Sequence, residues 1–140
     1  MASPVMRVTC KTHSLTSIEK FYVDGLGLKK FCPVQRIDDR DGLTLCLPHG
    51  RWQLVFTRKH SGDAETFEPP NDFLYLTFYE PDKGTWEGVV ERMEKSGYVP
   101  MDNVNDSWQK GELRVEDPDG WHILFHNEDW PMADAIERDV

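Results

Sequence analysis

The sequence is short of basic residues. Its 140 residues include 16 Lys and Arg against 25 Asp and Glu, which gives a formal net charge of -9. Contact with nucleic-acid phosphates needs a surplus of clustered Lys and Arg, so we expect no nucleic-acid partner. The acidic surface is most simply a feature that keeps the protein soluble.

Long apolar runs are also missing. No run approaches the roughly 20 apolar residues that cross a bilayer, and the segment Met1 to Lys11 lacks the basic start and apolar stretch of a signal peptide. We therefore expect a soluble cytoplasmic protein with no membrane partner.

Cysteine is scarce, and its spacing excludes the common cysteine sites. Cys10, Cys32 and Cys46 form no CxxC pair, and each lies in an apolar, strand-like context. This favours reduced thiols that pack in the core over disulfides or a zinc site. No neighbouring pattern supports an activated thiolate, which disfavours a catalytic cysteine.

The residues that are present, 39% of them hydrophobic, suffice for a packed core. Val5 to Lys11 alternates as a half-buried strand does. A helix follows, for which Thr16 and Glu19 have capping-box spacing and Gly25 and Gly27 supply stop signals. Three further strands are then predicted, over residues 28–37, 43–47 and 51–57.

After a polar connection over residues 58–72, the same order of elements repeats. A strand is predicted over 73–79, a helix runs from Asp82 to Glu94 and stops at Gly97, and three strands follow over residues 98–102, 112–116 and 121–127. A shift of 70 residues places Gly27 on Gly97, Pro48 on Pro118 and Gly50 on Gly120. The sequence therefore predicts an internal duplication.

Two stretches, FYVDGLGLKK at the end of the first helix and VEDPDGWHILF in the last hairpin, resemble the vicinal oxygen chelate superfamily, which includes glyoxalase I, bleomycin-resistance proteins and extradiol dioxygenases. The resemblance implies an α+β fold of two βαβββ modules that form half-barrels around a cleft. The modules are expected at residues 4–70 and 71–128, followed by an acidic tail over 129–140 in which Trp130, Pro131 and Met132 form a possible docking patch. Proteins of this kind commonly dimerise, so a homodimer is expected.

Metal-using proteins of that superfamily are similar in placing His or Glu at four points, on the first and last strand of each module. The resemblance maps the first point to Arg7, or to Thr9 after a shift of two residues. It maps the last strand of the first module to Gln53. The others map to one of Phe73, Leu74 and Tyr75, and to Leu124. An arginine cannot be deprotonated and a leucine has no donor atom, so we expect neither the usual metal site nor another cofactor.

The histidines offer a different site. His122 and His126 share the face of Leu124, but they would lie roughly 13 Å apart along a strand, which disfavours an unusual metal site with Glu116 or His49. His122 is interpreted as a rim residue near the turn. His126 lies deeper, where an imidazole could orient a ligand or move a proton. His13, His49 and His60 are expected in solvated loops.

Arg7 and Trp108 are the other candidates. Arg7 either pairs with Glu112 or Glu116, or anchors a carboxylate, enolate or phosphate of a ligand, with Gln53 opposite it. Trp108 lies in a polar connection, where it is either a lid over the cleft or a dimer contact. Phe67 could act similarly. A last set is expected under the helices: Trp52, Leu54 and Phe56.

Four functions compete. The first, which we favour, is a metal-independent small-molecule-binding protein whose pocket suits an anionic or aromatic ligand, with Arg7, Gln53, His122, His126 and Trp108 as ligand contacts. The second is a lyase, isomerase or cyclase in which His126 is the general acid or base and Arg7 holds an oxyanion. A divalent-metal lyase or dioxygenase is disfavoured. The fourth is a dimeric interaction module with a filled barrel.

Overall fold

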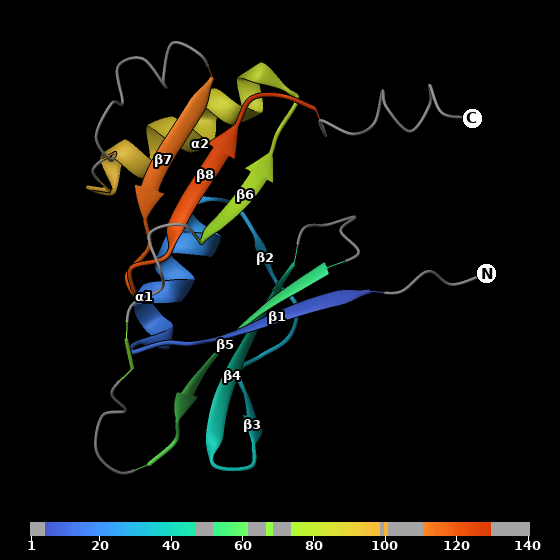
Figure 1. Cartoon of the computed structure of the whole chain (residues 1–140), viewed down its shortest axis with the longest axis vertical. Coiled ribbons are helices and arrows are strands. Elements are labelled where there is room, and N and C mark those ends of the chain that lie inside the picture. The colour runs from blue at the N-terminus through green and yellow to red at the C-terminus, as the bar shows by residue number, and fades with distance from the viewer. Residues whose placement is uncertain are drawn as a thin grey trace, which may run out of the picture. The chain divides into compact units, whose positions relative to one another are not determined.

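The structure is a computed structural model that describes residues 5–46, 52–61, 67–68, 74–98, 100 and 111–129. The chain divides into two units, Met1–Pro69 and Pro70–Val140. Each unit combines a sheet with one helical segment, as expected for an α+β fold of two sheet modules (Figure 1). None of the helices in the described part of the chain is long and apolar enough to span a membrane.

The sheet of the first unit has its first and last strands side by side. β1 (Met6–Lys11) pairs in parallel with β5 (Trp52–Lys59), and β5 pairs with the antiparallel β4 (Arg40–Cys46). Two short strands, β2 (Lys29–Lys30) and β3 (Gln35–Ile37), pair with β4 on its other side.

The predicted single strand over residues 28–37 is therefore wrong, because the chain pairs with β4 twice and leaves the sheet between the two contacts. Pro33 lies in this interruption and cannot donate a backbone hydrogen bond to a neighbouring strand. The backbone N–H of Phe31 still donates to the carbonyl of Thr44 at 2.9 Å, which keeps the interruption close to β4.

The helical segment begins at a different cap from the predicted one. Ser14 has an extended backbone, and its hydroxyl accepts a hydrogen bond from the N–H of Ser17 at 3.2 Å, so the helix begins before Thr16. α1 (Leu15–Glu19) continues into the π-helical turn η1 (Lys20–Gly25). Gly27, with a φ of 87°, ends the segment in the left-handed region, as predicted for a stop signal.

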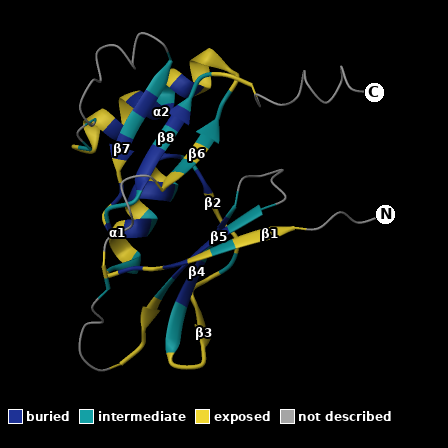
Figure 2. Cartoon of the chain, viewed as in Figure 1, coloured by how far each residue is buried: buried dark blue, intermediate teal, exposed yellow. Residues whose placement is uncertain are grey.

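The helical segment covers one face of the first sheet. Ile18, Phe21 and Tyr22 are fully buried, and the ring of Tyr22 lies 4.9 Å from that of Phe56. The position of Leu54 and Phe56 under the helix is confirmed, whereas Trp52 is only half-buried. Figure 2 shows the buried helix and sheet residues in dark blue and the exposed ends of the strands in yellow.

The second unit repeats this plan. β6 (Tyr75–Tyr79) pairs in parallel with β8 (His122–His126), and β7 (Glu112–Glu116) pairs antiparallel with β8 on its other side. The strand predicted over 98–102 lies largely outside the described residues.

One face of this second sheet is covered by α2 (Lys83–Lys95). The indole N–H of Trp86 donates to the carbonyl of Phe125 at 2.9 Å in the buried layer. The rest of this hydrophobic core consists of buried side chains from the helix and the sheet: Val89, Val90, Met93, Leu113, Val115 and Ile123. Asp82 caps the helix, as predicted, and Gly97 ends it with a φ of 85°.

Candidate functional site

The uncovered face of the second sheet carries polar and aromatic side chains. Because side chains alternate along a strand, residues paired across strands share a face. The pairing gives three rows on the side away from α2, which together we call the second-sheet face. They are Tyr75, His122 and Glu116; Thr77, Leu124 and Arg114; and Tyr79, His126 and Glu112.

Two tyrosine–histidine ring contacts lie on this face. The rings of Tyr79 and His126 are stacked, with centroids 5.4 Å apart and planes 16° apart. The rings of Tyr75 and His122 lie 5.6 Å apart at a tilt of 55°. His122 follows the hairpin turn, as expected, but it is buried rather than a rim residue.

Charged groups flank these rings. Arg114 forms an ion pair with Glu112 on the same strand, and Nδ1 of His126 lies 3.6 Å from a carboxylate oxygen of Glu128. A carboxylate near an imidazole nitrogen can fix the tautomer and orientation of the ring. The face therefore combines flat rings with oriented hydrogen-bonding groups.

Arg7 and Gln53 meet in the first unit. Arg7 is exposed, and its Nε and Nη2 donate to the side-chain oxygen of Gln53 at 3.0 and 2.7 Å. Glu112 and Glu116, the carboxylates considered as partners of Arg7, belong to the second unit, and their pairing with Arg7 stays a prediction. The facing positions of Arg7 and Gln53 follow from the parallel register of β1 and β5.

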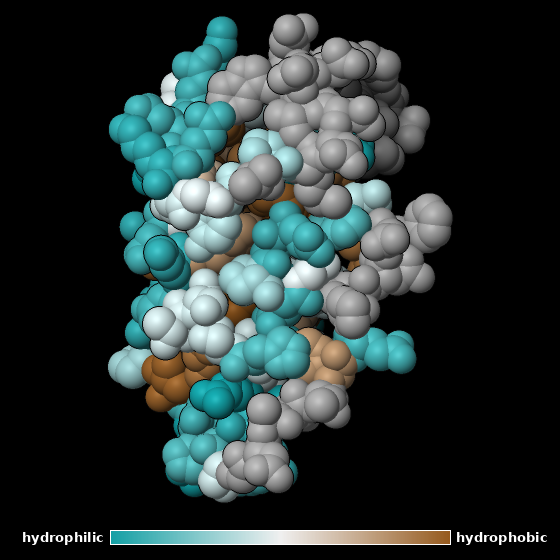
Figure 3. All heavy atoms as spheres, turned by 90° about the vertical axis from the view of Figure 1, so that its left-hand side faces the viewer, coloured by the Kyte–Doolittle hydropathy of each residue, from teal (hydrophilic) through white to brown (hydrophobic). Residues whose placement is uncertain are grey.

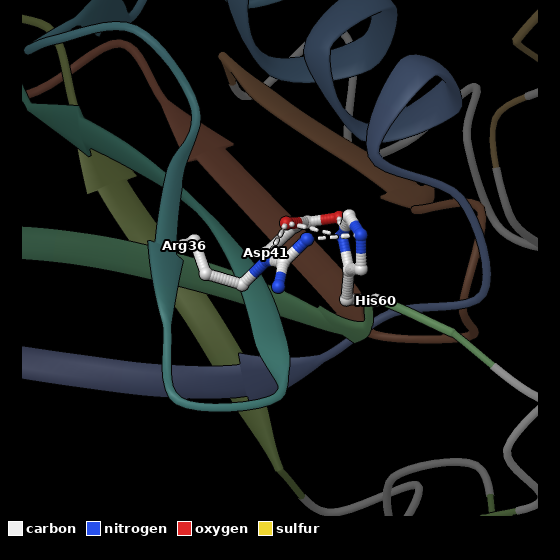
Figure 4. A network of polar contacts seen from close by, with 3 residues as sticks. All are labelled: Arg36, Asp41 and His60. Carbon is white, nitrogen blue, oxygen red and sulfur yellow. Dashed lines mark hydrogen bonds and ion pairs between the residues drawn. The ribbon is translucent and has the colours of Figure 1, made fainter.

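A separate ionic cluster joins the β3–β4 hairpin to the end of β5 (Figure 4). Nδ1 of His60 lies 3.0 Å from Asp41, Nε of Arg36 lies 3.6 Å from the same carboxylate, and the guanidinium of Arg36 contacts Nε2 of His60. His60 is exposed, as expected, and its ring also has these polar partners. The cluster therefore links β3, β4 and the residue that follows β5, which are neighbours in the same sheet.

Two expected loop residues are in contact. The ring of His13 is stacked on that of Phe67, with centroids 4.1 Å apart and planes 12° apart. His13 is exposed, as expected, but one face of its ring packs on the half-buried Phe67. Other predictions lie outside the described residues: Trp108, His49, Phe73, and the patch of Trp130, Pro131 and Met132.

The described positions bear on the metal site that the superfamily commonly has. Among them, no group of three or more His, Cys, Asp or Glu lies together in a way that could hold a metal ion. Of the candidates for the uncertain ligand point, Tyr75 lies on the second-sheet face and Leu74 precedes β6.

Sequence reasoning missed Tyr79 and Arg114 as part of this face. Their signal was present, because Tyr75 and Tyr79 have the same spacing in β6 as His122 and His126 have in β8. Recognising it required knowing that these two strands are neighbours.

Figure 3 shows one side of the molecule, on which the described residues are mainly hydrophilic and apolar atoms are visible in separate places. Large exposed apolar side chains lie at the start of β1, at the start of β6, and in or before β3: Val5, Met6, Phe31, Val34, Ile37, Leu74 and Tyr75.

Comparison with known proteins places the chain in a family. Residues 6–57 match the YycE-like N-terminal domain, and residues 63–127 match the YycE-like C-terminal domain. The YycE protein of Bacillus subtilis (strain 168) is 31% identical over 122 residues, which cover 87% of this chain and 86% of that protein. A crystal structure of a YycE protein from Bacillus subtilis, provisionally described as a glyoxalase/fosfomycin resistance protein, has a TM-score of 0.76 at 29% identity and covers 92% of this chain and 93% of its own.

More distant structures share the fold alone. The trypanothione-dependent glyoxalase I of Leishmania major has a TM-score of 0.72 at 19% identity, covering 99% of this chain and 95% of its own. TnmS3, an antibiotic binding protein from Streptomyces sp. CB03234, has a TM-score of 0.61 at 19% identity, covering 89% and 95%. The chain therefore belongs to the YycE-like family and has the fold of the vicinal oxygen chelate superfamily.

Proposed function

We propose that this protein is a metal-independent small-molecule-binding protein that holds an aromatic ligand on the second-sheet face. The observation that carries the proposal is the pair of tyrosine–histidine ring contacts across β6 and β8. Stacking of a ligand ring on such side chains adds roughly 0.5–1.5 kcal/mol beyond the burial of apolar area.

The arrangement of the face supports a binding role. The rings come from neighbouring strands, so little side-chain freedom is lost when a ligand packs on them. Thr77, Arg114 and Glu116 supply hydrogen-bonding groups beside the rings, which can fix the orientation of a ligand. TnmS3 is an antibiotic binding protein with this fold, which makes binding without conversion a reasonable use of the scaffold.

The second candidate is an enzyme that acts by acid–base chemistry at His126. It is favoured by Glu128, whose carboxylate lies 3.6 Å from Nδ1 of His126 and could orient the ring. The second-sheet face would then bind a substrate, and His126 would move a proton. The two functions differ in whether the bound molecule is converted.

Binding can be tested with naphthoate, an aromatic carboxylate, by calorimetric titration. Tyr79→Leu removes the ring stacked on His126 and retains an apolar side chain, so we expect its Kd to rise roughly threefold to tenfold. Phe31→Leu is the matched control, because Phe31 is 63% exposed in a different unit, and its Kd should not change.

An unchanged Kd for Tyr79→Leu, or an equal loss in both variants, would contradict the aromatic site. Chromatography of the titrated mixture separates the two candidate functions. A product that wild type forms and His126→Ala does not, with binding retained, would establish the enzyme instead. The homodimer, the cytoplasmic location, the module boundaries and the ligand contacts Arg7, Gln53, His122, His126 and Trp108 stay predictions.

A further inference from the structure

Two polar side chains lie next to each other on the open side of the first sheet. β1 and β5 run parallel, and their register places Arg7 beside Gln53. The next residues along these strands, Val8 and Leu54, turn to the other side of the sheet, where Leu54 is buried under the helical segment. Arg7 and Gln53 therefore lie on the side away from the helix, which we call the first-sheet face.

The hydrogen bonds between the two side chains use one edge of the guanidinium. Nε and Nη2 of Arg7 both donate to the side-chain oxygen of Gln53, at 3.0 and 2.7 Å. The N–H groups of Nη1 and the second N–H of Nη2 have no partner in the part of the chain that the structure describes. One N–H from each of these nitrogens forms the fork at the end of the side chain, which matches the two oxygens of a carboxylate.

The same bonds fix the direction of the amide of Gln53. A guanidinium has donors but no acceptor, so the amide must turn its oxygen toward Arg7. The amide nitrogen, which carries two N–H donors, then points away from the guanidinium. The pair therefore presents hydrogen-bond donors alone.

The surroundings of the pair leave its positive charge in place. The described strand positions on the first-sheet face hold no Asp or Glu that could neutralise Arg7. The next side chains on this face along β1 and β5 are Thr9 and Val55, which are uncharged. Arg7 is exposed and Gln53 is half-buried, so a dissolved molecule can reach the donors. A fixed cation beside uncharged neighbours attracts an anion.

We infer that Arg7 and Gln53 form a carboxylate-binding site in the first unit that selects for a group which only accepts hydrogen bonds. This site goes beyond the proposed aromatic site and uses none of the residues of the second-sheet face. A carboxylate places its two oxygens on the guanidinium fork, and its remaining lone pairs suit the amide N–H groups beside the fork. The carboxamide of the same acid has nearly the same shape but brings an NH2 group against these donors, so the site rejects it.

The test titrates two probes without an aromatic ring, cyclohexanecarboxylate and cyclohexanecarboxamide, into nitrogen-15-labelled protein at neutral pH. The NMR signals of the Arg7 Nε–H and of the Gln53 side-chain amide report on binding at this position. Both signals should shift with the acid. The Kd for the amide should be roughly tenfold higher or more, because hydrogen bonds to a charged group are the stronger ones.

Two variants probe the donors of the pair. Gln53→Glu is almost isosteric, but it replaces the amide N–H groups by an acceptor and sets a carboxylate against Arg7. This internal carboxylate takes the place of the ligand, so the Kd for cyclohexanecarboxylate should rise roughly tenfold or more. Arg7→Lys retains the charge without the fork, and its Kd should rise roughly threefold to tenfold. Arg7 is exposed, so this second variant decides the matter if Gln53→Glu fails to fold.

The matched control is Arg58→Gln, which changes the net charge by the same amount as Gln53→Glu does. Arg58 is exposed and lies five positions after Gln53 on β5, which places it on the opposite side of the sheet. Its Kd for cyclohexanecarboxylate should stay within about twofold of wild type, since only long-range attraction is altered.

Three results would overturn the inference. Equal affinities of wild type for the acid and the amide would mean that the donors do not select the ligand. An equal loss in Gln53→Glu and Arg58→Gln would mean that binding follows net charge. Absence of any shift of the Arg7 and Gln53 signals in wild type would mean that Arg7 is already neutralised, as a pair with Glu112 or Glu116 would do. The proposed aromatic site would stand in each case, because naphthoate and Tyr79→Leu test it separately.

Discussion

Asp82 illustrates how one side chain at the start of a helix becomes sensitive to pH. Its carboxylate accepts hydrogen bonds from the hydroxyl of Thr85 at 2.7 Å and from the backbone N–H of Thr85 at 2.8 Å. The hydroxyl bond first, and then the backbone bond, lower the pKa of Asp82 below its ordinary value. A lowered pKa in the folded state means that the ionised carboxylate stabilises the fold, and that this stabilisation is lost as the pH falls through the lowered pKa.

Asp82→Ala should therefore lower the melting temperature at neutral pH by a few degrees, through loss of the helix cap. The difference from wild type should shrink as the pH falls below the ordinary pKa of an aspartate, about 4, and then through the lowered pKa of Asp82 in the folded protein. Thermal unfolding followed by circular dichroism over a pH series measures this. Asp82→Ser is the control, since it keeps a capping oxygen but cannot titrate; a constant difference between Asp82→Ala and wild type down to pH 2 would contradict the prediction.

At the scale of elements, the β7–β8 hairpin depends on the sequence DPDG. One carboxylate oxygen of Asp117 accepts from the backbone N–H groups of both Asp119 and Trp121 at 2.9 Å, and Asp117 itself is buried. Gly120 has a φ of 94°, which favours glycine. The turn thereby fixes where β8 begins, and with it the position of His122 on the second-sheet face.

Asp117→Ala should destabilise the protein by roughly 2–4 kcal/mol, because two backbone donors lose a charged acceptor in a buried turn. Asp117→Asn retains one acceptor oxygen, so its free energy of unfolding should fall clearly less. Urea unfolding gives both free energies. Equal losses for the two variants would mean that the charge of Asp117, rather than its position as an acceptor, stabilises the turn.

The elements differ in how far their sequence determines them. The ranges of β1, β5 and α2 follow from local alternation and capping, so they could be predicted closely. The break between β2 and β3 could not, because it depends on which residues reach β4. The π-helical turn was missed as well, because Ile18, Phe21 and Tyr22 have the i, i+3, i+4 spacing of an ordinary α-helix.

At the scale of the whole molecule, the duplicated plan was predictable and the strand neighbours were not. Period-two patterns tell which side chains share a face of one strand, but not which strand lies beside it. Arg7 and Gln53 were placed opposite each other only through the resemblance, whereas the contacts of Tyr75 and Tyr79 with the histidines required the parallel pairing of β6 with β8.

Metal content is a property of the whole molecule that can be measured directly. Within the described residues, no group of three or more His, Cys, Asp or Glu could hold a metal ion, and Arg7 and Leu124 stand at two expected ligand points. We expect the purified protein to contain less than a stoichiometric amount of iron, nickel, zinc or manganese by mass spectrometry. Added divalent ions should not raise its melting temperature. Near-stoichiometric metal would revive the lyase and dioxygenase class.

In each unit the first strand has the last strand as its parallel neighbour, β1 beside β5 and β6 beside β8. During synthesis, Met6–Lys11 must therefore wait unpaired until Trp52–Lys59 has left the ribosome. A nascent or prematurely terminated chain would present an open strand edge for that whole interval, and such edges invite pairing with other chains. Protein made from truncated messages should consequently be a stronger substrate for chaperones than the finished chain.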